Sequence, residues 1–181
     1  MIEEAQIVEG CIKKDQRCRT LLYERYAPSL YAVALRYTKN EEDAQDVLQD
    51  AFLRIFDTIK LYDGRGSLLG WLNRIVINET LNFVKLRSKV IFESFDDYEE
   101  RIADESVVVS DKLTHEILLN IIRELPQGQQ AVFNLCVIDE YSYEEAAQML
   151  NCSQSTCRTQ LFKAKNLLKE KVNNFFKREN R

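Results

Sequence analysis

The sequence predicts an all-α protein of two small helical domains joined by a flexible acidic linker. Glycine and proline are scarce, 5 and 2 among 181 residues, which favours long helices with few tight turns. Apolar residues recur at the i, i+3, i+4, i+7 spacing of helices through most of the chain. That spacing ends where acidic residues greatly outnumber basic ones, as in a linker. We therefore expect domains at 1–88 and 112–181, with the acidic linker at 89–111.

The first domain is expected to begin with helices that have clear N-terminal caps. Asp15 can cap a first long helix, and Pro28 is expected to open a second. Asn40 can cap the helix at 40–59, whose apolar residues give the clearest amphipathic pattern in the chain. The polar edge of that helix carries Asp43, Asp46, Gln49, Asp50 and Arg54.

A turn at 62–67 separates this helix from the next one. Two glycines interrupt the helical pattern there, and Ser67 can cap a helix at 68–89. Tyr62, at the turn, could stack on an exposed base, although an exposed loop tyrosine needs no function. The following helix is expected to bury Trp71, Leu72, Ile75 and Val76. A second stripe carries Arg74, Asn78, Asn82 and Lys85, residue types that suit phosphates and base edges but also an ordinary solvated face.

The second domain contains a helix-turn-helix at 142–168. Two helices are expected before it. The first runs over 112–124 and is ended by Pro126, and the second carries apolar residues. Ser142 and Glu145 form the pattern of a capping box, Asn151 suits a left-handed turn position, and Ser153 can cap the second helix of the motif. Such a second helix commonly reads the DNA major groove. The packed face is expected to consist of Cys157, Leu161, Ala164 and Leu168.

Composition narrows the possible functions. With 45% hydrophobic and 30% charged residues and no apolar run of about 20 residues, the chain is expected to be cytoplasmic and not inserted in a membrane. One histidine and five cysteines without a C-x-x-C pair argue against a zinc site. Cys136, Cys152 and Cys157 suit a small-residue core, although a redox role for the last two stays open. Phosphate-loop and catalytic-triad patterns are missing from the sequence, so we expect no catalysis and no cofactor.

Three segments resemble the extracytoplasmic-function group of the main bacterial sigma family. They are NEEDAQDVLQDAFLRIF at 40–56, GRGSLLGWLNRIVINETLNF at 64–83 and LPQGQQAVFNLCVIDEYSYEEAAQMLNCSQSTCRTQLFKAKNLLKE at 125–170. Their order and spacing match the family over nearly the whole chain. The resemblance implies a transcription initiation factor whose partners are RNA polymerase core and promoter DNA, and in addition an anti-sigma factor or another recruiting protein.

The resemblance also implies roles for the polar residues. The segment at 43–56 resembles region 2.2, which implies polymerase contacts by Asp43, Asp46, Gln49, Asp50 and Arg54. Regions 2.3 and 2.4, which open the −10 element, correspond to the turn and the helix after it. Their implied DNA contacts are Tyr62, Arg65, Arg74, Asn78, Asn82 and Lys85. The recognition helix would read the −35 element with Ser155, Thr156, Arg158, Thr159 and Lys163.

Two departures and one rival interpretation remain open from the sequence. Family members often have glycine where this chain has Ser155, and a basic residue where it has Gln160. The −35 contacts therefore depend more on base reading than on charge, or another protein helps to place the domain. The rival is a helix-turn-helix regulator whose first domain is a dimer or sensor module. Such a regulator would bind duplex DNA without polymerase.

Overall fold

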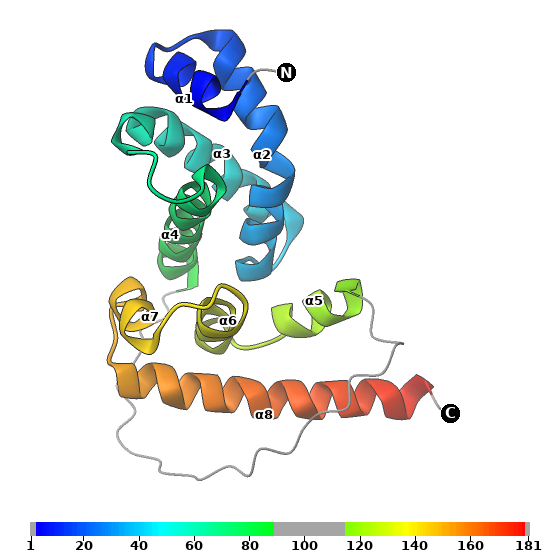
Figure 1. The fold of residues 1–181 in the computed structure, drawn as a ribbon. Coiled ribbons are helices and arrows are strands. Elements are labelled where there is room, and N and C mark those ends of the chain that lie inside the picture. Colours follow the sequence, from blue (N-terminus) through cyan, green and yellow to red (C-terminus); the bar gives the residue numbers. More distant parts are fainter. Residues whose placement is uncertain (1–2, 89–114, 180–181) are drawn as a thin grey trace. The chain divides into compact units, whose positions relative to one another are not determined.

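The computed structural model describes residues 3–88 and 115–179 (Figure 1). Within these ranges all regular structure is helical, which confirms the all-α prediction. The chain divides into two compact units, Met1–Phe83 and Val84–Arg181. The acidic linker predicted at 89–111 lies outside the described residues. No helix in the described ranges is long and apolar enough to cross a membrane.

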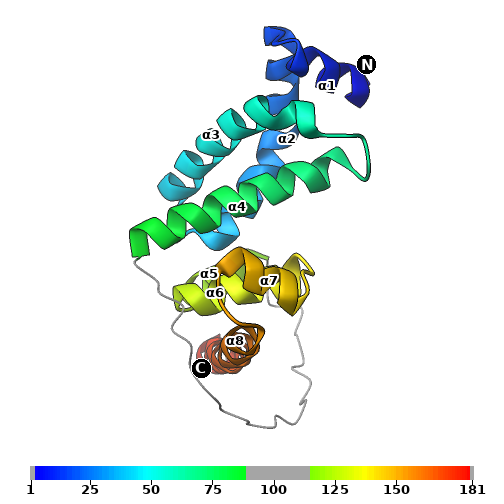
Figure 2. The same ribbon diagram turned by 90° about the vertical axis from the view of Figure 1, so that its left-hand side faces the viewer.

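The first unit is a small helical bundle. Figure 2 shows α3 and α4 lying next to each other, joined at one end by the segment that connects them. The elements are α1 (Glu4–Ile12), α2 (Gln16–Tyr37), α3 (Glu41–Thr58), the 3₁₀ turn η1 (Ile59–Leu61) and α4 (Leu68–Ser88). The last residues of α4, from Val84 on, are counted with the second unit.

The predicted N-terminal caps of the first unit are confirmed. The Asp15 carboxylate accepts a hydrogen bond from the Cys18 N–H at 2.8 Å, and the Asn40 side chain accepts one from the Asp43 N–H at 2.8 Å. Ser67 Oγ likewise accepts from the Gly70 N–H at 3.1 Å. Each cap satisfies a donor that the helix cannot, and such a cap contributes about 1 kcal/mol.

The prediction that Pro28 opens a helix is wrong, because Pro28 lies inside the continuous helix α2. Proline cannot donate to the carbonyl of the residue four positions earlier, which here is Glu24. Both Pro28 and Glu24 are exposed, so that carbonyl lies on the water-facing side of the helix. The apolar residues on the other side, from Leu22 to Tyr37, are buried without a break. Their packing outweighs the local cost of the proline.

The core of the first unit comes from all of its long helices. Leu22, Leu30, Tyr37, Ile55, Leu72 and Ile77 are almost completely buried. Trp71 and Ile75, expected in this core, are only half-buried. Helix α1 is tied to α2 by a hydrogen bond from the Tyr26 hydroxyl to the Glu4 carboxylate. Burial, reinforced by that bond, raises the pKa of Tyr26 to about 12.

The second unit is organised around one long helix. Helices α5, α6 and α7 all pack against α8, along one side of it (Figures 1 and 2). Its elements are α5 (His115–Arg123), α6 (Gln127–Phe133), the π turn η2 (Asn134–Ile138), α7 (Tyr143–Leu150) and α8 (Gln154–Glu179).

The end of α5, the following Leu125 and the part of α8 from Ala164 to Val172 share a hydrophobic core. Its buried members are Ile121, Ile122, Leu125, Ala164, Leu168 and Val172. The Lys171 ammonium lies 2.6 Å from the Glu124 carboxylate at the edge of this core. The acid is 62% exposed, so solvent screens the pair and it adds little stability. Packing of apolar residues therefore holds α8 against α5.

Candidate nucleic-acid interfaces

The helix-turn-helix has the local geometry that its sequence predicts. Ser142 Oγ accepts from the Glu145 N–H at 3.2 Å, and the Glu145 carboxylate accepts from the Ser142 N–H at 2.9 Å. Asn151 adopts a left-handed conformation with φ 55° and ψ 50°. The Cys152 N–H then returns to the Ala147 carbonyl at 3.0 Å, which closes helix α7. The turn between α7 and α8 is therefore fixed by backbone and cap contacts.

The first turn of α8 is held by Ser153. Its hydroxyl accepts from the Thr156 N–H at 3.0 Å and also lies 2.9 Å from Thr156 Oγ1 and 2.8 Å from Ser155 Oγ. Thr156 is only 2% exposed as a result. The cap network draws the Thr156 side chain inward, so it does not lie on the exposed face with the other residues predicted to contact DNA. Ser155 remains exposed beside it.

The outward face of α8 presents most of the other predicted residues. Arg158 and Lys163 are exposed and Thr159 is partly exposed, whereas Cys157, Leu161, Ala164 and Leu168 are buried as expected. The Arg158 guanidinium lies over the ring of Tyr143, 5.5 Å from its centroid. Tyr143 is the first residue of α7 and was not predicted as a site residue. It holds the arginine by a cation–π contact at the surface.

The loop between η1 and α4 forms a second candidate interface. Gly64 and Gly66 both have positive φ, 78° and 76°, which side-chain-bearing residues rarely adopt. Tyr62 donates its hydroxyl proton to the Gly66 carbonyl at 3.0 Å, and its ring lies 5.7 Å from that of Trp71. The predicted stacking residue thus also braces the loop.

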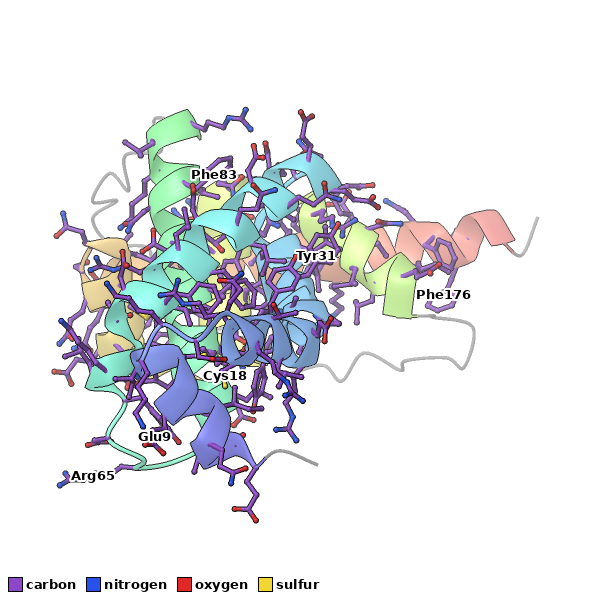
Figure 3. All side chains as sticks on the ribbon, turned by 90° about the horizontal axis from the view of Figure 1, so that it is seen from above. Glu9, Cys18, Tyr31, Arg65, Phe83 and Phe176 are labelled. Atoms are coloured by element: carbon purple, nitrogen blue, oxygen red, sulfur yellow. The ribbon has the colours of Figure 1, made fainter. Side chains whose placement is uncertain are left out.

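Arg65 is the most exposed charged residue of this loop. Its backbone N–H donates to the Asp63 carboxylate at 2.9 Å, and its Nε lies 3.4 Å from the second oxygen of that carboxylate. The Arg65 side chain is nevertheless 91% exposed. Figure 3 shows it at the outer edge of the first unit, pointing away from the helices. It is therefore available to an anionic partner.

Helix α4 continues this interface with the predicted polar stripe. Arg74, Asn78 and Asn82 are exposed, and Lys85 is half-buried. Trp71 lies on the same side, because residues at i, i+3, i+7 and i+11 share one helix face. The stripe is thus a polar face with an aromatic residue at its loop end.

Helix α1 adds a feature that sequence reasoning missed. A hollow of about 380 Å³ lies between α1 and the loop, and it is lined by Glu4, Ala5, Val8, Glu9, Ile12, Tyr62 and Gly64. Helix α1 carries no motif, so no signal in the sequence placed it beside this loop. On the loop side, Tyr62 and Gly64 line the hollow.

The polar edge of α3 is the third candidate face. Asp46, Gln49, Asp50 and Arg54 are exposed, whereas Asp43 is partly covered because the Asn40 amide also donates to its carboxylate at 3.1 Å. The face is not purely polar, since Leu53 is 65% exposed between these residues.

A groove between α2 and α3 adjoins this face and was also missed. Its volume is about 530 Å³, and Gln49 belongs to both the groove and the polar face. Tyr23 lies at the groove and is 45% exposed. Figure 3 shows Tyr31 on α2 of the first unit. The lining consists of Tyr23, Glu24, Ala27, Pro28, Tyr31, Gln45, Leu48 and Gln49.

Two protein-family models match the chain. Sigma-70 region 2 matches residues 22–90, and sigma-70 region 4 matches residues 115–168. The first match covers α2 to α4, and the second covers α5 through the middle of α8. Together they include the three candidate faces described above.

Curated relatives match over almost the full length. The chain is 27% identical over 184 residues to the ECF RNA polymerase sigma-E factor of Escherichia coli K12, covering 95% of both chains. It is 23% identical to the factor of the same name from Haemophilus influenzae, covering 94% of this chain and 96% of the relative.

Solved structures show the same fold. The sigma factor RpoE in complex with the anti-sigma factor NepR from Bartonella quintana has a TM-score of 0.56 at 21% identity, over 85% of this chain and 96% of that one. CnrH in complex with the cytosolic domain of CnrY has a TM-score of 0.52 at 20% identity, over 93% of this chain and 96% of that one.

Proposed function

The chain belongs to the extracytoplasmic-function sigma factors of the sigma-70 family, and on this basis we propose that it helps to melt the promoters to which it directs RNA polymerase. The observation that carries the proposal is that each of the two sigma-type units presents an exposed polar helix face where its family motif lies. Promoter selection is the function that such paired faces serve in a specificity factor of RNA polymerase.

In this proposal α8 reads the −35 element. Ser155, Arg158 and Thr159 lie in the first two turns of α8, the part of a recognition helix that is nearest to base edges. Arg158 can donate two parallel hydrogen bonds to guanine, and the ring of Tyr143 supports it. Lys163 is a turn farther along and suits a phosphate. Thr156 is buried beneath this face, where it contacts the Ser153 cap.

The 62–67 loop and α4 are proposed to open the −10 element. Arg65 and Arg74 supply exposed positive charge to the strand backbone, and Asn78 and Asn82 supply amides that suit base edges. The stripe ends at the half-buried Trp71, which is an aromatic platform beside the loop. Melting would follow if this face binds unpaired bases better than paired ones.

The polar face of α3 is proposed to dock on the polymerase core. Exposed carboxylates at Asp46 and Asp50 lie one helical turn apart, with Leu53 exposed between neighbouring polar residues. A charged surface with an apolar centre is typical of specific protein interfaces. The same face and the adjoining groove are where an anti-sigma factor would compete with the core.

A mobility-shift experiment separates this proposal from the rival regulator. Promoter fragments are incubated with the chain alone, with core polymerase alone and with both. We expect a specific, heparin-resistant complex only when both are present, because a chain with a formal net charge of −4 is not favoured to bind free duplex tightly. Equally tight and specific binding by the chain alone would support the duplex-binding regulator.

A further inference from the structure

We propose that Cys152 and Cys157 form a thiol–disulfide site that a hydroperoxide can oxidise, and that the resulting bond alters the −35 recognition helix. The second half of this inference rests on the proposed function, whereas the first half does not. Cys152 lies in the turn of the helix-turn-helix and Cys157 lies on the buried side of α8, so neither thiol belongs to the exposed faces assigned above.

The two sulfur atoms already lie in contact. Cys152 Sγ is 3.5 Å from Cys157 Sγ, and both thiols are free. A disulfide needs a separation of about 2.05 Å, so the sulfurs must approach by only about 1.5 Å. Cys152 follows the left-handed Asn151 and belongs to neither helix, whereas Cys157 lies within α8. The movement therefore falls mainly on the turn.

Exposure determines which sulfur meets the oxidant. Cys152 is half-buried and Cys157 is completely buried. Cys136 is a third half-buried thiol in the same unit, and it lies close enough to raise the pKa of Cys157 and to have its own pKa raised by Cys152. The described residues contain no group of three potential metal ligands arranged around one point, so a metal site is not the better interpretation of this cluster.

The chemistry balances with one hydroperoxide per bond. The Cys152 thiol gives up its proton, and its sulfur bonds to the terminal oxygen of the hydroperoxide as the oxygen–oxygen bond breaks. The rest of the hydroperoxide takes up the proton and leaves as an alcohol or, from hydrogen peroxide, as water. The product is a sulfenic acid. Cys157 then loses its proton, its sulfur attacks the sulfur of Cys152, and the sulfur–oxygen bond breaks to release water. Two thiols are oxidised by two electrons, and one hydroperoxide is reduced.

The surroundings make the site slow but selective. Burial raises the pKa of the Cys152 thiol, although contact with Cys157 and the positive charge of Lys85 act in the opposite direction. Burial, reinforced by Cys152 and Cys136, raises the pKa of Cys157 well above its usual range. Both sulfurs are therefore protonated at neutral pH, and the reactive thiolate is scarce. Bond formation should accelerate as pH rises from about 7 to about 9. The site therefore suits sustained oxidative stress rather than brief exposure.

The bond would act on the cap of the recognition helix. Ser153 lies inside the ring that the bond closes, and its hydroxyl contacts Thr156 and Ser155 at 2.8–3.0 Å. Hydrogen bonds of this length weaken when stretched by several tenths of an ångström. Drawing Cys152 toward Cys157 therefore disturbs the cap beneath the exposed Ser155 and Arg158. We expect weaker −35 reading in the oxidised protein.

Peptide mapping tests the bond itself. The full chain is treated with hydrogen peroxide, its remaining thiols are alkylated, and it is cleaved after Glu145 and Arg158 without reduction. Residues 146–158 then carry both Cys152 and Cys157, while Cys136 lies in a different peptide. We expect this peptide to be unalkylated and two hydrogens lighter. Full alkylation of Cys152 and Cys157, or a bond from either thiol to Cys136, would overturn the proposal.

Variants provide the matched controls. Cys136→Ser should leave the lighter peptide unchanged, whereas Cys152→Ser should abolish it. Cys152 is only half-buried, so this substitution avoids the completely buried Cys157 and should not prevent folding. A lighter peptide in the Cys152→Ser protein would contradict the assignment.

A promoter-binding assay tests the consequence. The chain is oxidised, freed of peroxide and then assembled with core polymerase. We expect oxidation to weaken discrimination of the −35 element about tenfold, which is the effect of losing one bidentate base contact. Reductant should restore the discrimination, and the Cys152→Ser protein should show no loss on oxidation. Unchanged discrimination in a fully bonded protein would overturn the effect on recognition. No −35 preference in the reduced wild type would instead refute the proposed function.

Discussion

Replacing Tyr143 with leucine measures how much its ring supports Arg158 at the −35 face. The guanidinium carbon lies 5.5 Å from the ring centroid, within the ~6 Å range of cation–π attraction. Both side chains are exposed, so the contact is worth about 0.5–1 kcal/mol. That free energy corresponds to about a two- to fivefold change in affinity. We expect holoenzyme containing Tyr143→Leu to lose that factor at promoters with a favourable −35 element.

The assay is holoenzyme binding across a library with a randomised −35 element. Tyr143→Phe is the matched control, because it keeps the ring and removes only the hydroxyl. Arg158→Ala alone should relax preference at one or two −35 positions. When Arg158 is already alanine, Tyr143→Leu should have almost no further effect, since a double-mutant cycle isolates the contact between the two residues.

Two results would refute this account of Tyr143. If Tyr143→Leu reduced −35 affinity equally with Arg158 present and with Arg158 replaced by alanine, the ring would act on some other group. Tighter −35 binding by Tyr143→Leu would mean that the ring restrains the arginine away from DNA. Either result would remove Tyr143 from the recognition surface.

Three further predictions test the proposed faces. Asp46→Lys together with Asp50→Lys should abolish co-purification with core polymerase without changing the circular dichroism, because both side chains are exposed; normal co-purification would exclude this face. Alanine at Asn78 and Asn82 should slow open-complex formation, at about 1–3 kcal/mol for each lost base contact, and unaltered permanganate footprints in the double mutant would contradict the assignment. Lys163→Ala should weaken all promoters alike and lower the salt slope by about one; a loss confined to certain −35 sequences would mean that it reads bases.

Local signals explain why most of the helical framework was predictable. Asp15, Asn40 and Ser142 each stand directly before an amphipathic segment, and each caps the helix that follows. A cap acts through donors only two or three residues away, so nearby sequence determines it. The left-handed turn at Asn151 was predictable for the same reason.

The positions of Pro28 and Thr156 differ from what local propensity and helical spacing suggest. A proline usually marks a helix start, but the apolar face of α2 continues past Pro28, with buried residues both before and after it in the sequence. Thr156 follows the outward periodicity of its helix, yet the hydroxyl of Ser153 draws it into the cap. Neither outcome follows from spacing alone.

The site features that were missed depend on residues distant in sequence. Tyr143 meets Arg158 across the turn of the helix-turn-helix, and no periodic pattern connects the two. Helix α1 lines the hollow at the 62–67 loop although it carries no motif. The groove beside the polar face of α3 needs α2 and α3 to pack together before it exists. Such features follow from tertiary packing, which single-sequence patterns do not encode.

In vitro transcription with sigma-free core polymerase tests the central claim most directly. The purified chain is added to core enzyme on a library of promoter fragments, and the transcripts are mapped by their 5′ ends. The account predicts discrete start sites that depend on the chain and lie downstream of shared −35 and −10 sequences. Transcription that is no more specific than with core enzyme alone, from a chain that binds core normally, would contradict it.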